Sequence, residues 1–183
     1  MNAAVFLDRD GTLIEEKEYL HRAQEVVFIP GALPALQRLS AAGFKLFLVT
    51  NQSGVGRGYF TLEDVDRVHA HINQELARAG IRFETIYVAP EAPGAPSRGR
   101  KPSPQFLFDA RDEYGIDLGR SFMIGDKRSD LECGWNAGVQ NTILVRTGYG
   151  ADLERTEAAG PLAGAMIVND LSSAAEWILK GGA

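Results

Sequence analysis

The chain has 183 residues, 45% of them hydrophobic, and its formal net charge at pH 7 is -5. This predicts one globular domain, residues 1–183, with a substantial core. The acidic balance argues against general affinity for nucleic acid or anionic membranes, and no apolar run approaches the roughly 18 residues that span a bilayer. The single cysteine, Cys133, excludes an internal disulfide. Without a secretion signal at the N-terminus, we expect a cytoplasmic protein with a small-molecule partner.

Short apolar runs and helical segments alternate along the whole chain. The expected strands are 3–7, 44–50, 85–89, 122–124, 142–145 and 165–168. The expected helices are 31–42, 61–80, 103 to about 114, a segment that holds Leu131 and Trp135, and 170–177. Thr61 and Asp64 have capping-box spacing, and Ser103 before Pro104 is typical of an N-cap. The alternation predicts an α/β fold whose parallel sheet is covered by helices on both faces.

The first expected strand ends at two carboxylates, Asp8 and Asp10. A period of two places both on the same side, where their charges repel each other. A divalent cation would relieve this repulsion and leave one carboxylate to attack an electrophile and the other to move protons. An ordinary Asp-Gly turn with no catalytic or metal-binding role would also explain this segment. A calcium-binding loop does not fit, because Leu13 and Tyr19 occupy the places of its glycine and closing glutamate.

Three further segments place polar residues near strand ends. Segment 50–54 offers hydroxyls, an amide and a glycine turn suited to phosphate oxygens, although a plain polar turn also fits. Lys101 follows a loop rich in proline, and Asp126 directly follows the fourth strand. Asp130, one helical turn later, is expected to cap its helix or to support the site from behind. Because ligands of open parallel sheets bind at the carboxyl ends of strands, the segments predict one site.

The remaining chemical candidates are weak. His69 and His71 are two residues apart on one expected helix, do not share a face, and are expected at the surface. Cys133 is expected to be a small buried side chain. Tyr59 stands where a dinucleotide fingerprint needs its third glycine, which argues against that motif.

The ordered set Asp8-x-Asp10-Gly-Thr, Thr50-Asn51, Lys101-Pro and Gly125-Asp126-x-x-x-Asp130 resembles the haloacid dehalogenase superfamily of phosphohydrolases over nearly the whole chain. Asp-Arg-Asp-Gly-Thr-Leu, Thr-Asn-Gln-Ser-Gly, Arg57-Gly58-x-Phe60 and Arg100-Lys101-Pro102 are similar to its bacterial heptose bisphosphate phosphatases. The resemblance implies a Rossmann-like three-layer sandwich, Mg²⁺ as cofactor and an aspartyl-phosphate intermediate. It also implies removal of the C7 phosphate of D-glycero-D-manno-heptose 1,7-bisphosphate in the synthesis of lipopolysaccharide heptose precursors.

The resemblance also implies a role for each matching residue. Asp8 would attack phosphorus, and Asp10 would give a proton to the leaving oxygen and later take one from water. Thr50, Asn51 and Lys101 would hold the transferring phosphoryl oxygens, with Asp8, Asp10, Thr50 and Lys101 as the catalytic set. The metal would be held by Asp8, Asp126 and the backbone carbonyl of Asp10. The further substrate-binding candidates are Gln52, Ser53, Arg57, Arg100, Lys127 and Tyr19.

Two departures from the subfamily pattern are plain. Many members hold a structural zinc with cysteine and histidine ligands, but segments 89–93 and 97–99 contain neither residue type, so we expect no zinc. Restricted backbone freedom in the loop rich in proline would hold Arg100 and Lys101 instead. Where the heptose enzymes tend to have Asp-His-Gly-Tyr, this chain has Glu-Lys-Glu-Tyr at 16–19 and keeps only Tyr19.

Intervals 13–43 and 55–100 have no room for a cap domain, so specificity is expected from loops 15–22, 53–60 and 89–101 around an open site in a monomer. One basic cluster favours a substrate with two phosphates, and its members are Arg57, Arg98, Arg100, Lys101 and Lys127. Histidinol-phosphate phosphatase activity is the nearest alternative. A noncatalytic phosphate- or nucleotide-binding module is a more distant alternative, and Asp10 argues against it because a pure phosphate binder does not need that charge.

Overall fold

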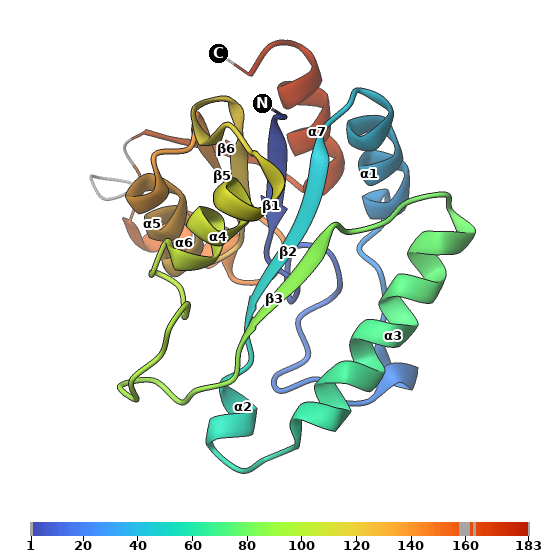
Figure 1. Cartoon of the computed structure of the whole chain (residues 1–183), viewed down its shortest axis with the longest axis vertical. Coiled ribbons are helices and arrows are strands. Elements are labelled where there is room, and N and C mark those ends of the chain that lie inside the picture. The colour runs from blue at the N-terminus through green and yellow to red at the C-terminus, as the bar shows by residue number, and fades with distance from the viewer. Residues whose placement is uncertain (1, 158–161, 163, 183) are drawn as a thin grey trace.

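The structure is a computed structural model that describes residues 2–157, 162 and 164–182. Within these residues one six-stranded sheet has the order β3-β2-β1-β4-β5-β6 (Figure 1). Its strands are β1 (Ala4–Leu7), β2 (Lys45–Asn51), β3 (Thr85–Ala89), β4 (Phe122–Gly125), β5 (Asn141–Val145) and β6 (Ala165–Val168). All neighbouring strands are parallel, and Leu7 pairs with Leu48 on one side and Ile124 on the other. The predicted α/β sheet is confirmed.

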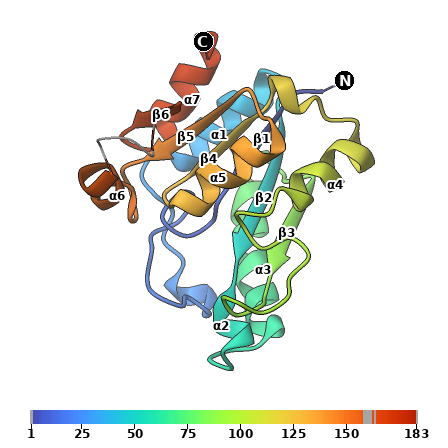
Figure 2. The ribbon, with the colours of Figure 1, turned by 90° about the vertical axis from the view of Figure 1, so that its left-hand side faces the viewer.

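Helices cover both faces of this sheet and make the three layers of the predicted sandwich. The helices are α1 (Ala32–Ala41), α2 (Ser53–Gly56), α3 (Leu62–Arg78), α4 (Gln105–Tyr114), α5 (Arg128–Ala137), α6 (Gly150–Glu157) and α7 (Leu171–Leu179). Helices α1, α3 and α7 lie on one face and α4, α5 and α6 on the other, the face toward the viewer in Figure 2. Short 3-10 turns span Ala23–Glu25 and Leu118–Arg120.

The central strand shows why the sheet is two-sided. Val5 and Leu7 pack with the core under α1, α3 and α7, whereas Ala4 and Phe6 pack with the core under α4 and α5. All four side chains are fully buried, as expected for an apolar run without alternation in the middle of a parallel sheet.

Most predicted boundaries agree with the structure to within one or two residues. The capping box of α3 is confirmed: the Thr61 N–H donates to Asp64 and the Asp64 N–H donates to Thr61 Oγ1. The predicted cap of α4 is wrong by one residue, because Pro104 is the N-cap and Ser103 Oγ accepts from the Gln105 N–H. The short helices α2 and α6 were not predicted.

The carboxyl ends of the strands form the edge that carries the site. Helix α2 follows β2 at this edge, at the bottom of Figure 1, and both chain ends lie at the opposite edge. Between β1 and β2 the described chain has one 3-10 turn and α1, and between β2 and β3 it has α2 and α3. As predicted, there is no cap domain in these described intervals. No helix of the described chain is long and apolar enough to cross a membrane.

Candidate active site

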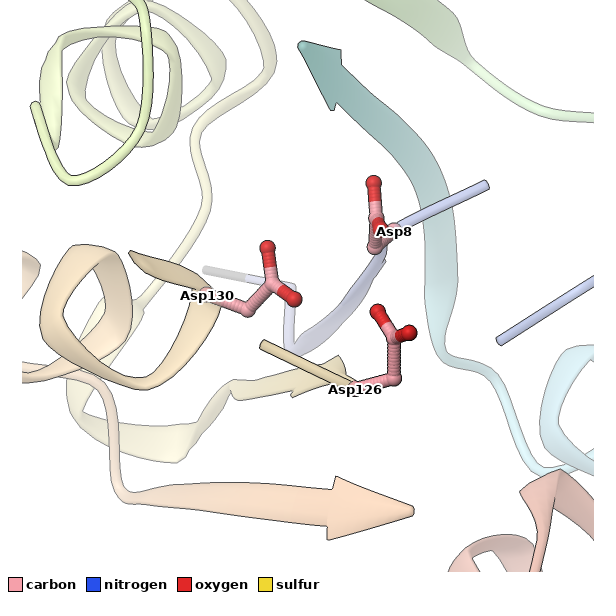
Figure 3. A group of neighbouring side chains, drawn as sticks. All are labelled: Asp8, Asp126 and Asp130. Carbon is pink, nitrogen blue, oxygen red and sulfur yellow. The ribbon is translucent and has the colours of Figure 1, made fainter. Parts of the chain in front are cut away.

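Three buried carboxylates meet at the edge where β1 and β4 end. Asp8 directly follows β1, Asp126 directly follows β4, and Asp130 lies in the first turn of α5. Each offers a carboxylate oxygen, and these oxygens lie within 4.8 Å of one another (Figure 3). Asp8 is 5% exposed and the other two are fully buried. Three negative groups in such a place require nearby positive charge.

Lys101 supplies one of the positive charges. Its Nζ lies 2.6 Å from Asp8 Oδ1 and 2.7 Å from Asp130 Oδ1, and it donates to the carbonyl of Val49. Lys101 is only 3% exposed, so it is not an ordinary surface lysine. Asn51 fixes its backbone, since Asn51 Oδ1 accepts from the Lys101 N–H and Asn51 Nδ2 donates to the Lys101 carbonyl.

The charges within the cluster move its pKa values in opposite directions. Burial would raise the pKa of Asp8, but the charges of Lys101 and Lys127 bring it below its ordinary value. Burial and the neighbouring Asp8 charge raise the pKa of Asp126 to about 8. Burial would lower the pKa of Lys101, but the charges of Asp130 and Asp8 hold it above its ordinary value. Asp8 therefore carries the charge expected of a nucleophile.

The oxygens left over at this cluster fit a hard divalent cation. Asp126 Oδ1 is buried and has no hydrogen-bond partner in the described chain, whereas its Oδ2 accepts from the Tyr149 N–H. Such an orphaned carboxylate oxygen is costly unless a cation or water satisfies it. Carboxylate oxygens are preferred ligands of Mg²⁺. The Asp10 backbone carbonyl, expected as a further ligand, remains a prediction.

Two glycines leave room for the Asp126 carboxylate. A Cβ on Gly148 would lie 2.1 Å from Asp126 Oδ2, and one on Gly11 would lie 2.2 Å from the same atom. Both glycines also have positive φ, 58° and 82°. Any other residue would therefore push Asp126 out of the cluster.

The prediction that Asp8 and Asp10 crowd each other is wrong, because each carboxylate has other neighbours. Strand β1 ends at Leu7, and the chain then turns so that three later N–H groups, those of residues 12, 13 and 14, donate to the Arg9 carbonyl. The period of two of a strand therefore does not place Asp10, although Asp10 and Asp8 line the same hollow. The Asp10 carboxylate accepts from Arg9 Nε at 2.9 Å, Arg9 Nη2 at 3.0 Å and Gln52 Nε2 at 3.0 Å. Asp8 is crowded instead by Asp126 and Asp130.

A small hollow and a larger cavity adjoin these groups. The hollow, about 30 Å³, is lined by Asp8, Asp10, Asn51, Lys101, Lys127, Ser129 and Asp130. The cavity, about 390 Å³, shares Asp10, Asn51 and Lys127 with the hollow. Of the predicted substrate-binding residues it adds Tyr19, Gln52 and Ser53. The structure thus brings the motif residues of four separate segments together.

Thr50 lies just behind this surface. It is 1% exposed and its Oγ1 accepts from Gln52 Nε2. The cavity is also lined by residues that were not among the predicted site residues. Glu16 and Glu18 come from loop 15–22, Phe60 from the loop before α3 and Tyr149 from the loop between β5 and α6. Glu18 and Tyr19 have positive φ, 30° and 58°, which is unfavourable for residues other than glycine.

The predicted basic cluster is only partly free to meet a ligand. Arg98 is paired with Asp109 of α4, and Lys127 Nζ lies 2.9 Å from Glu16 Oε2. Arg57 is exposed and lies near Arg100, whose pKa is lowered first by burial and also by the Arg57 charge. Neither of these two arginines lines the larger cavity.

Hydrogen bonds hold the loop that precedes Lys101. Ser97 Oγ donates to Glu91 Oε2 at 2.7 Å and accepts from the Arg100 N–H at 3.1 Å. Arg100 Nη1 donates to the Glu91 carbonyl at 3.0 Å, and the Gly56 N–H donates to the Pro90 carbonyl. The loop is therefore tied to itself and to α2 by hydrogen bonds, in addition to the predicted stiffness of its prolines.

Two predictions outside the motifs have opposite outcomes. Cys133 is buried, as predicted, and burial raises the pKa of its thiol to about 12. His69 is 6% exposed, so its predicted surface location is wrong. It lies four residues after Val65 and three before Ile72, both buried on α3, and this helical spacing was the signal for the buried face.

Comparisons with known proteins agree with this arrangement. A family model described as HAD-hydrolase-like matches residues 99–174. The D-glycero-beta-D-manno-heptose-1,7-bisphosphate 7-phosphatase of Pasteurella multocida is 42% identical over 154 residues, which cover 81% of this chain and 84% of that protein. The enzyme of the same name from Escherichia coli K12 is 35% identical and covers 97% and 94%. The D,D-heptose 1,7-bisphosphate phosphatase of B. bronchiseptica, solved with magnesium and phosphate, superposes with a TM-score of 0.88 at 32% identity, covering 97% and 98%.

Proposed function

The chain belongs to the haloacid dehalogenase-like hydrolases, in the family of the heptose-1,7-bisphosphate 7-phosphatases, and we propose that it removes the C7 phosphate of D-glycero-D-manno-heptose 1,7-bisphosphate. The observation that carries the proposal is the buried ammonium of Lys101 between Asp8 and Asp130, at the hollow that Asp10 also lines. This places a charged carboxylate, a second carboxyl group and a cation around one small space. In-line phosphoryl transfer to a carboxylate requires these parts.

In the first step, Asp8 attacks phosphorus and the bond from phosphorus to the sugar oxygen breaks. Asp10 gives its proton to that oxygen, so the sugar leaves as an alcohol. Lys101, Asn51 and the turn after Thr50 hold the oxygens of the transferring group, whose negative charge they offset. The product is a mixed anhydride of Asp8 and phosphate.

In the second step, Asp10 takes a proton from water as the water oxygen attacks phosphorus. The bond between phosphorus and Asp8 breaks, inorganic phosphate leaves, and both carboxyl groups return to their starting states. Asp8 and Asp126 would hold Mg²⁺, with Asp130 beside them, and the orphaned Asp126 Oδ1 supports this assignment. The bound ion supplies positive charge that lowers the repulsion between two anions.

The two cavities have different parts in this proposal. The hollow of about 30 Å³ takes the phosphoryl group, and the cavity of about 390 Å³ takes the polyol of the sugar. Arg57 and Arg100, close enough to repel each other, are the groups we assign to the second phosphate. Because all these residues belong to one chain, a monomer suffices for the reaction, which would serve the synthesis of lipopolysaccharide heptose precursors.

One observation favours a second substrate class. Glu18 lines the larger cavity and forms no ion pair within the described chain, so its carboxylate suits a cationic amine as well as sugar hydroxyls. Histidinol phosphate carries such an amine. Histidinol-phosphate phosphatase activity therefore remains the alternative.

Phosphate release tests the proposal directly. The purified protein is assayed with the heptose bisphosphate and with histidinol phosphate, each with Mg²⁺ present or chelated. We expect turnover that requires Mg²⁺ and is faster with the bisphosphate. Asp8→Asn should abolish turnover and also the covalent phosphoprotein detectable by mass spectrometry after acid quenching. Faster turnover of histidinol phosphate would favour the alternative, and full activity of Asp8→Asn would refute the mechanism.

A further inference from the structure

Arg9, inside the first motif, has one of the most buried side chains of the described protein at 1% exposure. Its guanidinium donates two hydrogen bonds to the Asp10 carboxylate, from Nε to Oδ2 and from Nη2 to Oδ1. It also donates to Gln52 Oε1 at 3.1 Å and to the Leu20 carbonyl at 3.3 Å. The group therefore joins loop 15–22 and the end of β2 to the proposed acid–base residue.

His69 completes the set of partners around this guanidinium. Arg9 Nη1 lies 3.3 Å from His69 Nε2, across 60 residues of sequence. Burial, together with the charge of Arg9, lowers the pKa of His69 to about 3. A neutral imidazole offers one nitrogen as an acceptor, and a guanidinium can only donate, so the contact is a hydrogen bond from Arg9 to His69. Helix α3 thereby fixes the far side of the guanidinium.

The hydrogen bonds at Asp10 differ between its two oxygens. Oδ2 accepts from Arg9 and from Gln52, whereas Oδ1 accepts from Arg9 alone. Each carboxyl oxygen has two lone-pair sites, so Oδ2 is filled and Oδ1 keeps one open. The open site is the one able to meet the leaving oxygen. The arrangement selects one oxygen and one orientation for proton transfer.

We infer that Arg9 and His69 are positioning residues that hold Asp10 so that its Oδ1 serves proton transfer. The inference rests on the proposed function, in which Asp10 protonates the leaving oxygen. Neither residue lines the hollow assigned to the phosphoryl group, although Arg9 also lines the cavity assigned to the sugar. Loss of either should therefore slow proton transfer and leave binding of the phosphoryl group and attack by Asp8 nearly unchanged.

Leaving-group chemistry separates this role from a merely structural one. An alkyl phosphate such as the sugar ester needs a proton on its leaving oxygen, whereas 4-nitrophenyl phosphate releases a stable anion and needs none. The ratio kcat/KM reports only the steps through formation of the phosphorylated enzyme. A misplaced Asp10 should thus lower kcat/KM for the alkyl ester far more than for the aryl ester. General acid catalysis is worth about 10²–10⁴-fold, which sets the ceiling of the effect.

The test compares His69→Leu, which removes the acceptor, with His69→Gln, whose amide oxygen can replace it. His71→Leu is the matched control. His71 lies on the same helix, and because it is two residues away from His69 it is on another side of that helix. We expect His69→Leu to lose about tenfold or more with the sugar ester and less than about threefold with the aryl ester. His69→Gln should recover most of the loss, and His71→Leu should match the wild type. If His69→Leu does not fold, Arg9→Lys provides a second test, because it keeps the charge but loses the bidentate hydrogen bonding to Asp10. It should likewise lose more kcat/KM with the sugar ester than with the aryl ester.

Asp10→Asn makes the two possible failures distinguishable. If Asp10→Asn itself loses both activities equally, the proposed acid role of Asp10 is wrong. If Asp10→Asn shows the leaving-group bias but the His69 and Arg9 variants lose both activities equally, or neither, the positioning inference alone is overturned.

Discussion

Replacing Lys101 with methionine removes the ammonium group that lies between Asp8 and Asp130. The side chain is about the same length, so the change deletes charge and hydrogen bonds with little change in volume. In the wild type this ammonium lies 2.6 Å and 2.7 Å from the two carboxylates, and all three side chains are at most 6% exposed. Without it, those two carboxylates and Asp126 share one buried space, and the remaining cation there is Lys127, whose Nζ lies 4.0 Å from Asp126 Oδ1.

The expected loss of folding stability follows from this burial. Removing one partner of a buried ion pair costs about 3–5 kcal/mol, because the remaining charge stays buried and unpaired. Proton uptake by Asp126, whose pKa burial already raises to about 8, keeps the loss near the lower end of this range. For a chain of this length the loss corresponds to a decrease in Tm of about 6–20 °C. Saturating Mg²⁺ should restore part of it, because the ion binds only the folded protein.

Chemical unfolding in the presence of a chelator, repeated with Mg²⁺, measures the loss. Lys45→Met is the matched control, since Lys45 is also paired with a carboxylate, Glu84 at 2.8 Å, but its side chain is 37% exposed. Such an exposed pair contributes about 0.2–1 kcal/mol. The reasoning is refuted if Lys101→Met destabilises the metal-free protein no more than Lys45→Met. The same variant should also lower kcat about 10²–10³-fold, the usual effect of losing one group that stabilises transition-state charge.

Three further outcomes are expected. Gly148→Ala should abolish turnover, because its Cβ would lie 2.1 Å from Asp126 Oδ2. The control Gly115→Ala, also at positive φ but facing open space, should keep turnover and lose about 1–2 kcal/mol of folding stability. Equal turnover of the two variants would contradict the predicted clash. In metal-free protein, the contribution of Asp126 to the free energy of unfolding should be complete below its ordinary pKa of 3.8 and lost as the pH rises through about 8, since folding raises this pKa. If the free energies of unfolding of the wild type and Asp126→Asn change in parallel with pH across this range, the prediction is wrong. Ser97→Ala should raise KM for the bisphosphate about fivefold with little change in kcat, because the Arg100 N–H loses its acceptor; an unchanged KM would show that the loop is held otherwise.

Local patterns in the sequence were enough to predict the architecture. Apolar runs that end at Leu7 and near Ile124, with helical segments between them, identify a parallel sheet, and the carboxyl ends of such strands meet at one edge. The sequence alone therefore assigns Asp8, Lys101 and Asp126 to one site. This worked because strand ends and polar turn residues are local signals that the topology brings together.

Side-chain partners were decided only by the tertiary structure. Lys101 meets Asp8 across 93 residues and Arg9 meets His69 across 60, and no spacing along the chain encodes either contact. Because the chain turns after Leu7, the Asp10 carboxylate pairs with Arg9 and the Asp8 carboxylate lies beside Asp126 and Asp130. This differs from the crowding of Asp8 and Asp10 that a period of two predicted. An ion pair or hydrogen bond depends on where two side chains end in space, and that position is set by sheet register and helix packing together. Sequence thus determined which groups reach the edge of the sheet, and the packed fold determined which of them touch.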